Sequence, residues 1–229
     1  MKLAHLDRND SLHLKATGVY EPFWTDLFKR TFKPGQTFVD VGAHIGYYTA
    51  MAAEAGAGEI HAFEPDPDNY RLLEQNCREV ANLYELAVSD RTGRAMLYRC
   101  VTNSGDHRLF ETEGRESVEV GVTRLDDVRE LAGRCVDFVK IDAQGEETRI
   151  LRGAAGLLER SPNVVGIVEL APEHLALGGS SAKELLCLLG ELGFSVYVKR
   201  ERVLVPGVIE HLVDLRRHIN LFIRRRGAG

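Results

Sequence analysis

The sequence contains few cysteines, no marked excess of one charge and no long apolar run. Four cysteines occur in 229 residues, and no two are close enough in sequence to suggest a zinc site or a redox disulfide. We expect Cys77, Cys100, Cys135 and Cys187 to be reduced thiols, mostly packed in the interior. The formal net charge of −5 gives no reason to expect a nucleic-acid partner.

Signals for a membrane or for export are also lacking. No stretch approaches the roughly 20 apolar residues of a membrane-spanning helix, and the N-terminus, Met1-Lys-Leu-Ala-His, lacks the apolar run of a signal peptide. We therefore expect a cytosolic protein without a membrane partner. Because 44% of the 229 residues are hydrophobic, the chain can bury one large core, and we predict a single domain over 1–229.

Strand-like and helix-like segments alternate from residue 37 onward, with no repeat or low-complexity interruption. This alternation is typical of an α/β fold with a mainly parallel, Rossmann-like sheet and helices on both faces. The seven predicted strands are Thr37–Val41, Glu59–Phe63, Tyr84–Val88, Val136–Ile141, Val164–Glu169, Ser195–Lys199 and Asn220–Arg224. The predicted helices are Tyr47–Ala55, Pro67–Val80, Glu146–Leu158 and Ala182–Leu192.

Two regions do not follow this alternation. Residues 1–36 form an N-terminal cap segment, in which Phe23–Arg30 is expected to be a short helix over the ligand mouth. Residues 94–123 contain two short extended segments, Ala95–Cys100 and Ser117–Val122, on either side of a polar loop. Ligand sites in open α/β sheets gather at the carboxyl ends of the strands, so a substrate role for this loop competes evenly with simple solvation.

The first predicted strand leads into a glycine turn that indicates a nucleotide-type ligand. An NAD fingerprint needs Gly-x-Gly-x-x-Gly to hold a pyrophosphate, whereas this turn has His44 at the middle glycine position. A carboxylate at the mouth of the turn would repel a pyrophosphate but suits the ammonium of a methionyl group. We therefore infer S-adenosylmethionine as the cofactor, although the glycines could serve only tight packing. The candidate cofactor-binding residues of the turn are Asp40, Gly42, Ala43, His44 and Gly46.

The ends of the second and third predicted strands supply further cofactor candidates. Glu64 can accept hydrogen bonds from a ribose diol, and the alternative role of capping the next helix is better filled by Asp66. Ser89 and Asp90 follow the third strand, where the adenine amino group lies in this kind of fold. An Asx turn would explain Asp90 nearly as well.

Carboxylates also end the fourth and fifth predicted strands, at Asp142 and Glu169. Several acids around one mouth do not arise from core packing, since ionised groups repel unless a cation or a proton separates them. The pair could act as a general base with its orienting partner, or as oxygen ligands of a divalent metal. Asp142 could also simply cap the helix that follows. Asp142 is in addition a candidate cofactor contact.

Six segments, in this order along the chain, resemble the FkbM-type methyltransferases, a branch of the S-adenosylmethionine-dependent class. The resemblance covers roughly residues 19–169 and implies a class I methyltransferase fold, whose seven-stranded sheet ends in an antiparallel hairpin. It also implies methyl transfer, usually to an oxygen of a sugar, polyketide or other natural product. His44 and Gln144 depart from the family pattern, which usually has Asn and Glu there. The six segments are Val19–Pro22, Val39–Thr49, Phe63–Pro67, Leu86–Asp90, Thr123–Asp127 and Val136–Glu147.

Methyl transfer to an alcohol requires a residue that takes the hydroxyl proton. Asp142 ranks first because the fold fixes its strand-end position, with Glu169 beside it. His107 has an ordinary pKa of about 6.5, near the working range, but it lies on a loop. Because Gln144 removes one negative charge from the site, we predict no metal; a divalent ion, if present, would bind Asp142 and Glu169. The residues expected to contact a small-molecule acceptor are Tyr20, Asn103, Ser104, Asp106 and His107.

Two other functions compete with an S-adenosylmethionine-dependent O-methyltransferase. A noncatalytic protein that binds S-adenosylmethionine or a partner would fit if Gln144 marks decay of the site. An NAD-dependent oxidoreductase shares the fold but conflicts with Asp40 and the missing middle glycine.

Overall fold

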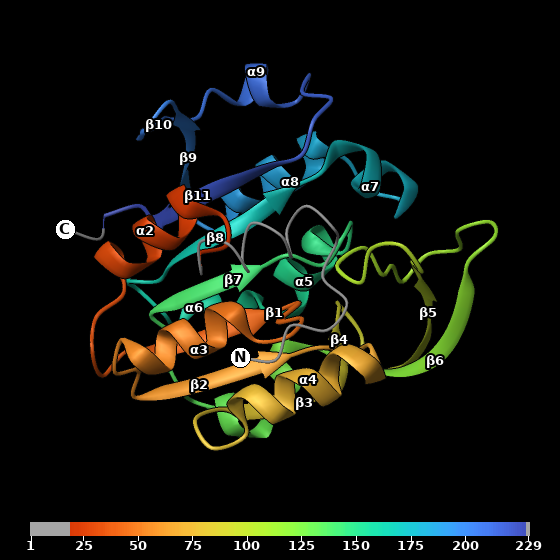
Figure 1. The fold of residues 1–229 in the computed structure, drawn as a ribbon. Helices are drawn as coiled ribbons and strands as arrows, with labels where there is room; N and C mark the ends of the chain where they lie inside the picture. The colour runs from red at the N-terminus through yellow and green to blue at the C-terminus, as the bar shows by residue number, and fades with distance from the viewer. Residues whose placement is uncertain (1–18, 228–229) are drawn as a thin grey trace.

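The computed structural model describes residues 19–227. A central sheet of eight strands is covered by helices on both faces, and a second sheet of three strands lies beside it (Figure 1). The predicted α/β, Rossmann-like class is confirmed. Of the N-terminal cap segment, residues 1–18 lie outside the described residues, and the predicted helix over Phe23–Arg30 is present as α2, Pro22–Thr31.

The main sheet has the strand order β10-β9-β11-β8-β7-β1-β2-β3. β11 pairs antiparallel with both β8 and β9, as the family resemblance implied. The strands are β1 (Thr37–Val41), β2 (Glu59–Phe63), β3 (Asn82–Tyr84), β7 (Phe138–Ile141), β8 (Val165–Leu170), β9 (Phe194–Arg200), β10 (Val203–Pro206) and β11 (Ile219–Arg225). The eighth strand, β10, was not predicted; it forms a hairpin with β9 through a turn in which Glu201 has a left-handed φ of 52°.

The second sheet corrects the prediction of one strand over Tyr84–Val88. The chain leaves the main sheet at Glu85: Tyr84 pairs with β2, whereas β4 (Leu86–Val88) pairs with β6 (Glu116–Thr123). Leu86 can pack there because Gly121 has no side chain; a Cβ at Gly121 would come within 2.6 Å of the Leu86 side chain. The extended segments predicted within residues 94–123 are confirmed as β5 (Gly93–Arg99) and β6, an antiparallel pair.

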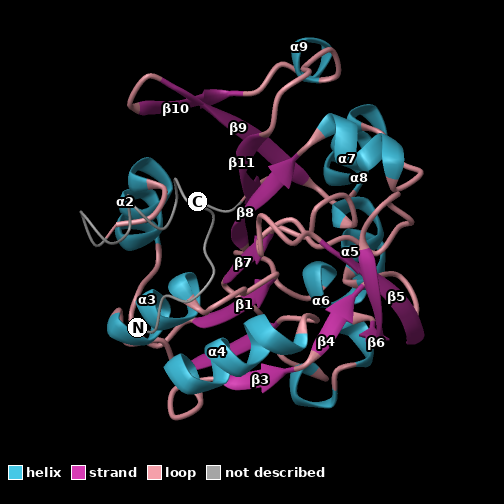
Figure 2. Ribbon diagram, turned by 45° about the vertical axis from the view of Figure 1, so that its right-hand side comes forward, coloured by secondary structure: helices cyan, strands magenta, loops and turns pink. Residues whose placement is uncertain are grey.

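The helices lie on two faces of the main sheet, with α2 and α3 on one side and α5, α6 and α8 on the other (Figure 2). The predicted helix over Glu146–Leu158 is two helices, with Ala154 at a non-helical φ of −113° between them. The helices besides α2 are α3 (Tyr47–Glu54), α4 (Pro67–Cys77), α5 (Glu147–Gly153), α6 (Ala155–Glu159), α7 (Pro172–Leu177), α8 (Ala182–Glu191) and α9 (Ile209–Leu212). Two short 3₁₀ turns span Leu125–Asp127 and Arg129–Leu131.

Aromatic packing fixes α2 over the sheet. The Phe28 ring packs edge-on against Phe38 of β1 and Phe138 of β7, with ring centroids 5.3 and 4.8 Å apart. Phe28 and both strand residues are fully buried, and burial of such rings typically contributes about 1.5–3 kcal/mol each. This packing holds the residues just before α2, Tyr20 and Glu21, at the carboxyl ends of the strands.

The four cysteines are free thiols, as predicted, but the expectation that most are internal was wrong. Only Cys77 is buried; Cys100 is half-buried, and Cys135 and Cys187 are exposed. Cys77 is internal because α4 packs on the glycine turn after β1, where its thiol contacts the carbonyl of Gly46. None of the helices within residues 19–227 is long and apolar enough to cross a membrane.

Candidate active site

A cavity of about 1010 Å³ opens at the carboxyl ends of β1, β2, β7 and β8 and extends past β9 to α9. Of the predicted site residues, it is lined by Tyr20, Asp40, Gly42, Ala43, His44, Glu64, Asn103, Ser104, Asp106, His107, Asp142 and Glu169. We call the part lined by Asp40, His44, Glu64, Lys140 and Asp142 the inner end of the cavity.

The glycines of the β1–α3 turn are required by contacts within the protein. Gly42 has a φ of 76°, and a Cβ there would lie 1.9 Å from the carbonyl oxygen of Asp142. A Cβ on Gly46 would lie 2.7 Å from the Cys77 sulfur. The packing alternative therefore accounts for both glycines, and close packing of the turn sets the position of Asp142.

Asp40 is buried, and within the described residues only one of its two carboxylate oxygens accepts a hydrogen bond. The Thr49 hydroxyl donates to Oδ2 at 2.7 Å, whereas Oδ1 has no hydrogen-bond partner among the described residues. Burial raises the pKa of Asp40, partly offset by the nearby ammonium of Lys140. An unpartnered buried carboxylate oxygen on the cavity wall fits a cationic ligand group such as the methionyl ammonium.

Glu64 ends β2 and is held by the backbone around it. The amide of His44 donates to Oε2 at 2.9 Å and the amide of Asp66 donates to Oε1 at 3.0 Å. Burial raises the pKa of Glu64 to about 7. Asp66, as expected, caps α4 by accepting from the amides of Asp68 and Asn69. The Asn69 side chain also donates to Glu64 Oε1, at 3.5 Å, so the spare lone pair of Glu64 is on Oε2.

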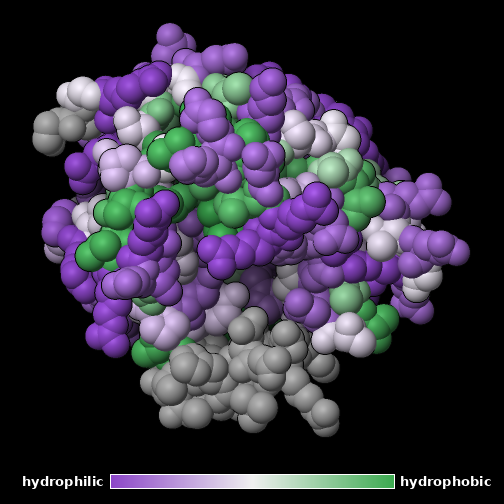
Figure 3. All heavy atoms as spheres, turned by 90° about the horizontal axis from the view of Figure 1, so that it is seen from above, coloured by the Kyte–Doolittle hydropathy of each residue, from purple (hydrophilic) through white to green (hydrophobic). Residues whose placement is uncertain are grey.

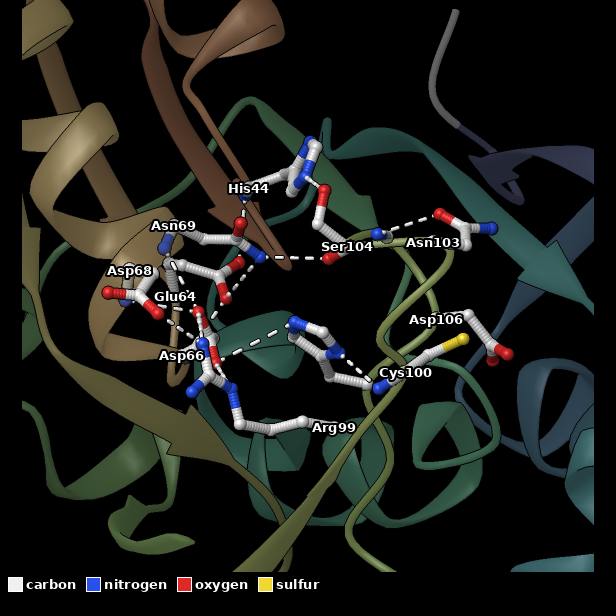
Figure 4. Close-up of polar contacts among 12 residues, drawn as sticks. His44, Glu64, Asp66, Asp68, Asn69, Arg99, Cys100, Asn103, Ser104 and Asp106 are labelled. Carbon is white, nitrogen blue, oxygen red and sulfur yellow. Dashed lines mark hydrogen bonds and ion pairs between the residues drawn. The ribbon is translucent and has the colours of Figure 1, made fainter. Parts of the chain in front are cut away.

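The polar loop of residues 100–108 is fastened to the inner end (Figure 4). The Ser104 hydroxyl and Nε2 of His44 lie 2.9 Å apart, and the Asn69 side chain donates to the Ser104 carbonyl at 2.8 Å. His44 has a left-handed φ of 53°, and burial lowers its pKa to about 4, so the contact with Ser104 joins neutral groups. The loop therefore covers the turn that follows β1.

His107 faces Asp66, and its Nδ1 is already engaged in a hydrogen bond. Its Nδ1 accepts from the amide of Cys100 at 3.0 Å, and its Nε2 lies 3.6 Å from the Asp66 carboxylate. Burial lowers the pKa of His107. Since accepting a proton at Nδ1 would break the contact with Cys100, this arrangement favours a loop-holding role over the predicted role as a base.

The other residues predicted to contact the acceptor make ion pairs or hydrogen bonds within the protein. Asp106 forms ion pairs with Arg108 and Arg115, each within 2.7 Å. The Asn103 side chain accepts from the amide of Gly105 at 2.9 Å, as in an Asx turn. Tyr20 lines the cavity, and its amide donates to the Tyr47 hydroxyl at 3.1 Å.

Ser89 and Asp90 are not among the described residues that line the large cavity. The Ser89 hydroxyl donates to Glu146 at 3.0 Å and borders a smaller cavity of about 270 Å³. The adenine placement at these two residues rested on a third strand that continues in the main sheet, and the departure of the chain at Glu85 removes that basis.

Lys140 is a residue of the site that the sequence reasoning missed. Its buried ammonium lies 2.9 Å from Asp142 Oδ2 and 5.1 Å from the centre of the Tyr48 ring. Although burial by itself favours the neutral amine, the carboxylates of Asp142, Asp40 and Glu21 raise the pKa of Lys140. A lysine inside Phe138–Ile141, which is otherwise apolar, was the available signal, by the argument applied to Asp40.

Lys140 supplies the cation that the cluster of strand-end acids requires. Burial by itself favours protonated Asp142, but the ion pair with Lys140 and a 2.9 Å hydrogen bond from Gln144 lower the pKa of Asp142. Gln144 also donates to Glu169, at 3.2 Å. For Glu169, burial and the charges of Asp142 and Glu147 raise the pKa well above its ordinary value.

The two strand-end carboxyls therefore differ in character, since Asp142 is a stabilised anion and Glu169 is the stronger base. Within residues 19–227, no three His, Cys, Asp or Glu side chains are grouped closely enough to hold a metal ion.

Comparison with known proteins agrees with this geometry. The model of the FkbM methyltransferase domain matches residues 40–196, more than half of the chain. A search of curated proteins found no match to this sequence.

Solved structures with the same fold include three class I methyltransferase relatives. A TehB-like S-adenosylmethionine-dependent methyltransferase from Corynebacterium glutamicum has a TM-score of 0.54 and 12% identity, over 93% of this chain and 92% of that one. A Streptococcus mutans protein described as a methyltransferase, in complex with S-adenosylhomocysteine, has a TM-score of 0.52 and 9% identity, over 89% and 96%. A protein described as an rRNA methylase from Clostridium thermocellum has a TM-score of 0.52 and 12% identity, over 89% and 95%.

At these identities the structural likeness shows the fold, and the family assignment rests on the sequence match. The buried free oxygen of Asp40 and the spare lone pair on Glu64 Oε2 fit the cofactor of that family. The chain belongs to the family of the FkbM methyltransferase domain, and it is an S-adenosylmethionine-dependent methyltransferase.

Proposed function

We propose that the protein transfers a methyl group to a hydroxyl oxygen of a small molecule. The observation that carries this proposal is the difference between the two strand-end carboxyls: Asp142 is paired with Lys140, whereas Glu169, with 12% of its side chain exposed, forms no salt bridge with a lysine or arginine among residues 19–227. Attack by an alcohol requires removal of its proton, and a base of raised pKa in a dry cavity suits that task.

The inner end is assigned to the cofactor. Asp40 would hold the methionyl ammonium and Glu64 the ribose hydroxyls, as their free lone pairs allow. An apolar slot beside Glu64 would take the adenine ring. Its walls are Pro65, Ala87, Val88, Leu97 and Leu109. S-adenosylmethionine, when bound, supplies an electrophilic methyl group on a sulfonium.

Glu169 is the proposed proton acceptor, which reverses the ranking expected from the sequence. Asp142 is held by Lys140 and Gln144, so protonation of Asp142 would break an ion pair. Glu169 accepts one hydrogen bond from Gln144 and has His218 at 3.9 Å. Asp142 then positions Lys140 and Gln144, and proximity of the reacting groups supplies much of the rate.

The test compares Glu169→Gln with Asp142→Asn and with Glu173→Gln, an exposed control on α7. Calorimetry first measures S-adenosylmethionine affinity, and labelled cofactor is then screened against neutral and charged alcohols. Glu169→Gln should keep cofactor affinity and slow transfer by roughly 10²-fold or more. Wild-type transfer should rise with pH as Glu169 ionises, and the variant should lack that rise. A larger loss in Asp142→Asn, with the pH dependence intact in Glu169→Gln, would return the role of base to Asp142.

The noncatalytic alternative loses its main support in this geometry. Gln144 donates one hydrogen bond to Asp142 and another to Glu169, so the amide replaces repulsion between acids with two contacts. A protein that binds S-adenosylmethionine but methylates no alcohol in the screen would still favour that alternative. The sugar or polyketide nature of the acceptor and a cytosolic location stay predictions.

A further inference from the structure

The outer part of the cavity is lined by basic side chains. Lys199 and Arg200 end β9, and Arg217 and His218 precede β11, while His211 belongs to α9. We call these five residues the basic rim; all five are exposed. The antiparallel pairing of β9 with β11 brings the two segments side by side. Seen from above, this face carries hydrophilic side chains interspersed with apolar ones (Figure 3).

The permanent cations of the basic rim have no carboxylate partners within the described part of the chain. Neither Arg200 nor Arg217 forms an ion pair there, and the Lys199 ammonium lies over the Phe23 ring at 5.1 Å. By contrast, Arg115, just before β6, is paired with Asp106 of the polar loop. The acids facing the rim are Glu201, in the β9–β10 turn, and Glu169 below it, 3.9 Å from His218.

The two ends of the cavity therefore have opposite charge. At the inner end, Glu21, Asp40 and Asp142 surround the single ammonium of Lys140, whereas the outer end carries Lys199, Arg200 and Arg217 against Glu201. An anionic group would be repelled from the inner acids and attracted to the basic rim. Arginine presents a planar fork of donors that matches phosphate and carboxylate oxygens.

Exposed arginines are commonly only solvated, and Arg202 and Arg216 provide the comparison. Both are exposed and, within residues 19–227, lack an ion pair, but neither lines the cavity. Position on the cavity is what separates Arg200 and Arg217 from these neighbours. We propose that the acceptor alcohol carries an anionic group, phosphate or carboxylate, which Arg200, Arg217 and Lys199 bind while its hydroxyl points to Glu169. This inference rests on the proposed function.

A footprinting experiment tests the rim without any turnover. Arginine modification by phenylglyoxal is followed by mass spectrometry on protein loaded with S-adenosylhomocysteine, in the presence of inorganic phosphate, acetate or glycerol. Phosphate or acetate should slow modification of Arg200 and Arg217 but leave Arg202 and Arg216 unchanged, and glycerol should protect none. Protection by one anion alone identifies which oxyanion the rim selects. Equal protection of all four arginines, or of none, would overturn the proposal, as would protection of all four by a short single-stranded RNA.

A matched pair of variants then tests the acceptor. Arg200→Gln/Arg217→Gln should raise KM for a phosphorylated or carboxylated alcohol by about tenfold or more, the scale of a lost charge-assisted hydrogen bond, with kcat and cofactor affinity nearly unchanged. Arg202→Gln/Arg216→Gln should behave like the wild type. Preference for uncharged alcohols, unaffected by the rim variant, would contradict the proposal while leaving O-methylation standing. Cofactor binding without transfer to any alcohol, together with rim protection, would instead contradict the proposed function.

Discussion

The inner end of the cavity and its basic rim are built in opposite ways. At the inner end the charged groups are held by the fold, as Asp40 is by Thr49, Glu64 by two backbone amides and Asp142 by Lys140. At the rim, Arg200 and Arg217 are exposed and without ion pairs in the described chain. A rigid inner end suits a cofactor that is the same in every turnover, whereas exposed side chains at a strand end and on the connection before β11 can differ without disturbing the sheet.

The largest effect is expected from breaking the inner end at Gly42. Gly42→Ala places a Cβ 1.9 Å from the Asp142 carbonyl oxygen and keeps a φ of 76°, so strain and overlap together should cost about 3 kcal/mol or more of unfolding free energy. Gly35→Ala is the matched control, because Gly35 has a φ of 81° but no atom near its Cβ position. It should cost about 1–2 kcal/mol.

Urea unfolding measures both glycine variants. An equal loss of stability in the two would show that the β1–α3 turn can move away from β7, and that the inner end is less rigid than the contacts at Gly42 indicate.

The carboxylates of the inner end could be predicted from the sequence, because the alternation of strand-like and helix-like segments shows where each strand ends. Asp40, Glu64 and Asp142 each follow an apolar run, and parallel strands bring such ends to one edge. The same argument failed for Ser89, since nothing local shows that the chain changes sheets at Glu85. That change depends on the distant partner strand β6.

The basic rim could not be predicted for a related physical reason. β10 and α9 have only four residues each, which is too short to show a strand or helix period. Arg200 and Arg217 line the same cavity because β9 pairs antiparallel with β11, a long-range contact. Within the sheet, Lys140 was predictable, because a lysine in an apolar strand needs a partner as much as an aspartate does.

A smaller effect should follow from removing the ribose contact at Glu64. Glu64→Ala should weaken S-adenosylmethionine binding by roughly 10–10²-fold for each hydrogen bond lost, since a hydrogen bond to a charged group contributes about 1.5–3 kcal/mol. Hydroxyl donors favour the ionised carboxyl, and burial raises the pKa of Glu64 to about 7. Wild-type affinity should therefore rise with pH through about 7, with a proton released on binding.

Calorimetry in buffers of different ionisation enthalpy measures that proton release, and circular dichroism checks that the Glu64 variant is folded. A folded variant with wild-type affinity and the same pH dependence would make Glu64 a support for the turn rather than a ribose ligand.

The smallest effect concerns the polar loop, which lies between the two regions. Ser104→Ala removes the 2.9 Å contact with His44 but leaves the Asn69 bond to the Ser104 carbonyl, so the loop should loosen without detaching. A neutral hydrogen bond contributes about 0.5–1.5 kcal/mol net, which corresponds to a two- to tenfold loss of cofactor affinity if the loop covers bound cofactor. Amide exchange should quicken over residues 100–108, including the Cys100 amide that donates to His107. Val101→Ala, at an exposed position of the same loop, is the control. Faster exchange with unchanged affinity would separate the loop from the cofactor and assign it to the acceptor side of the cavity.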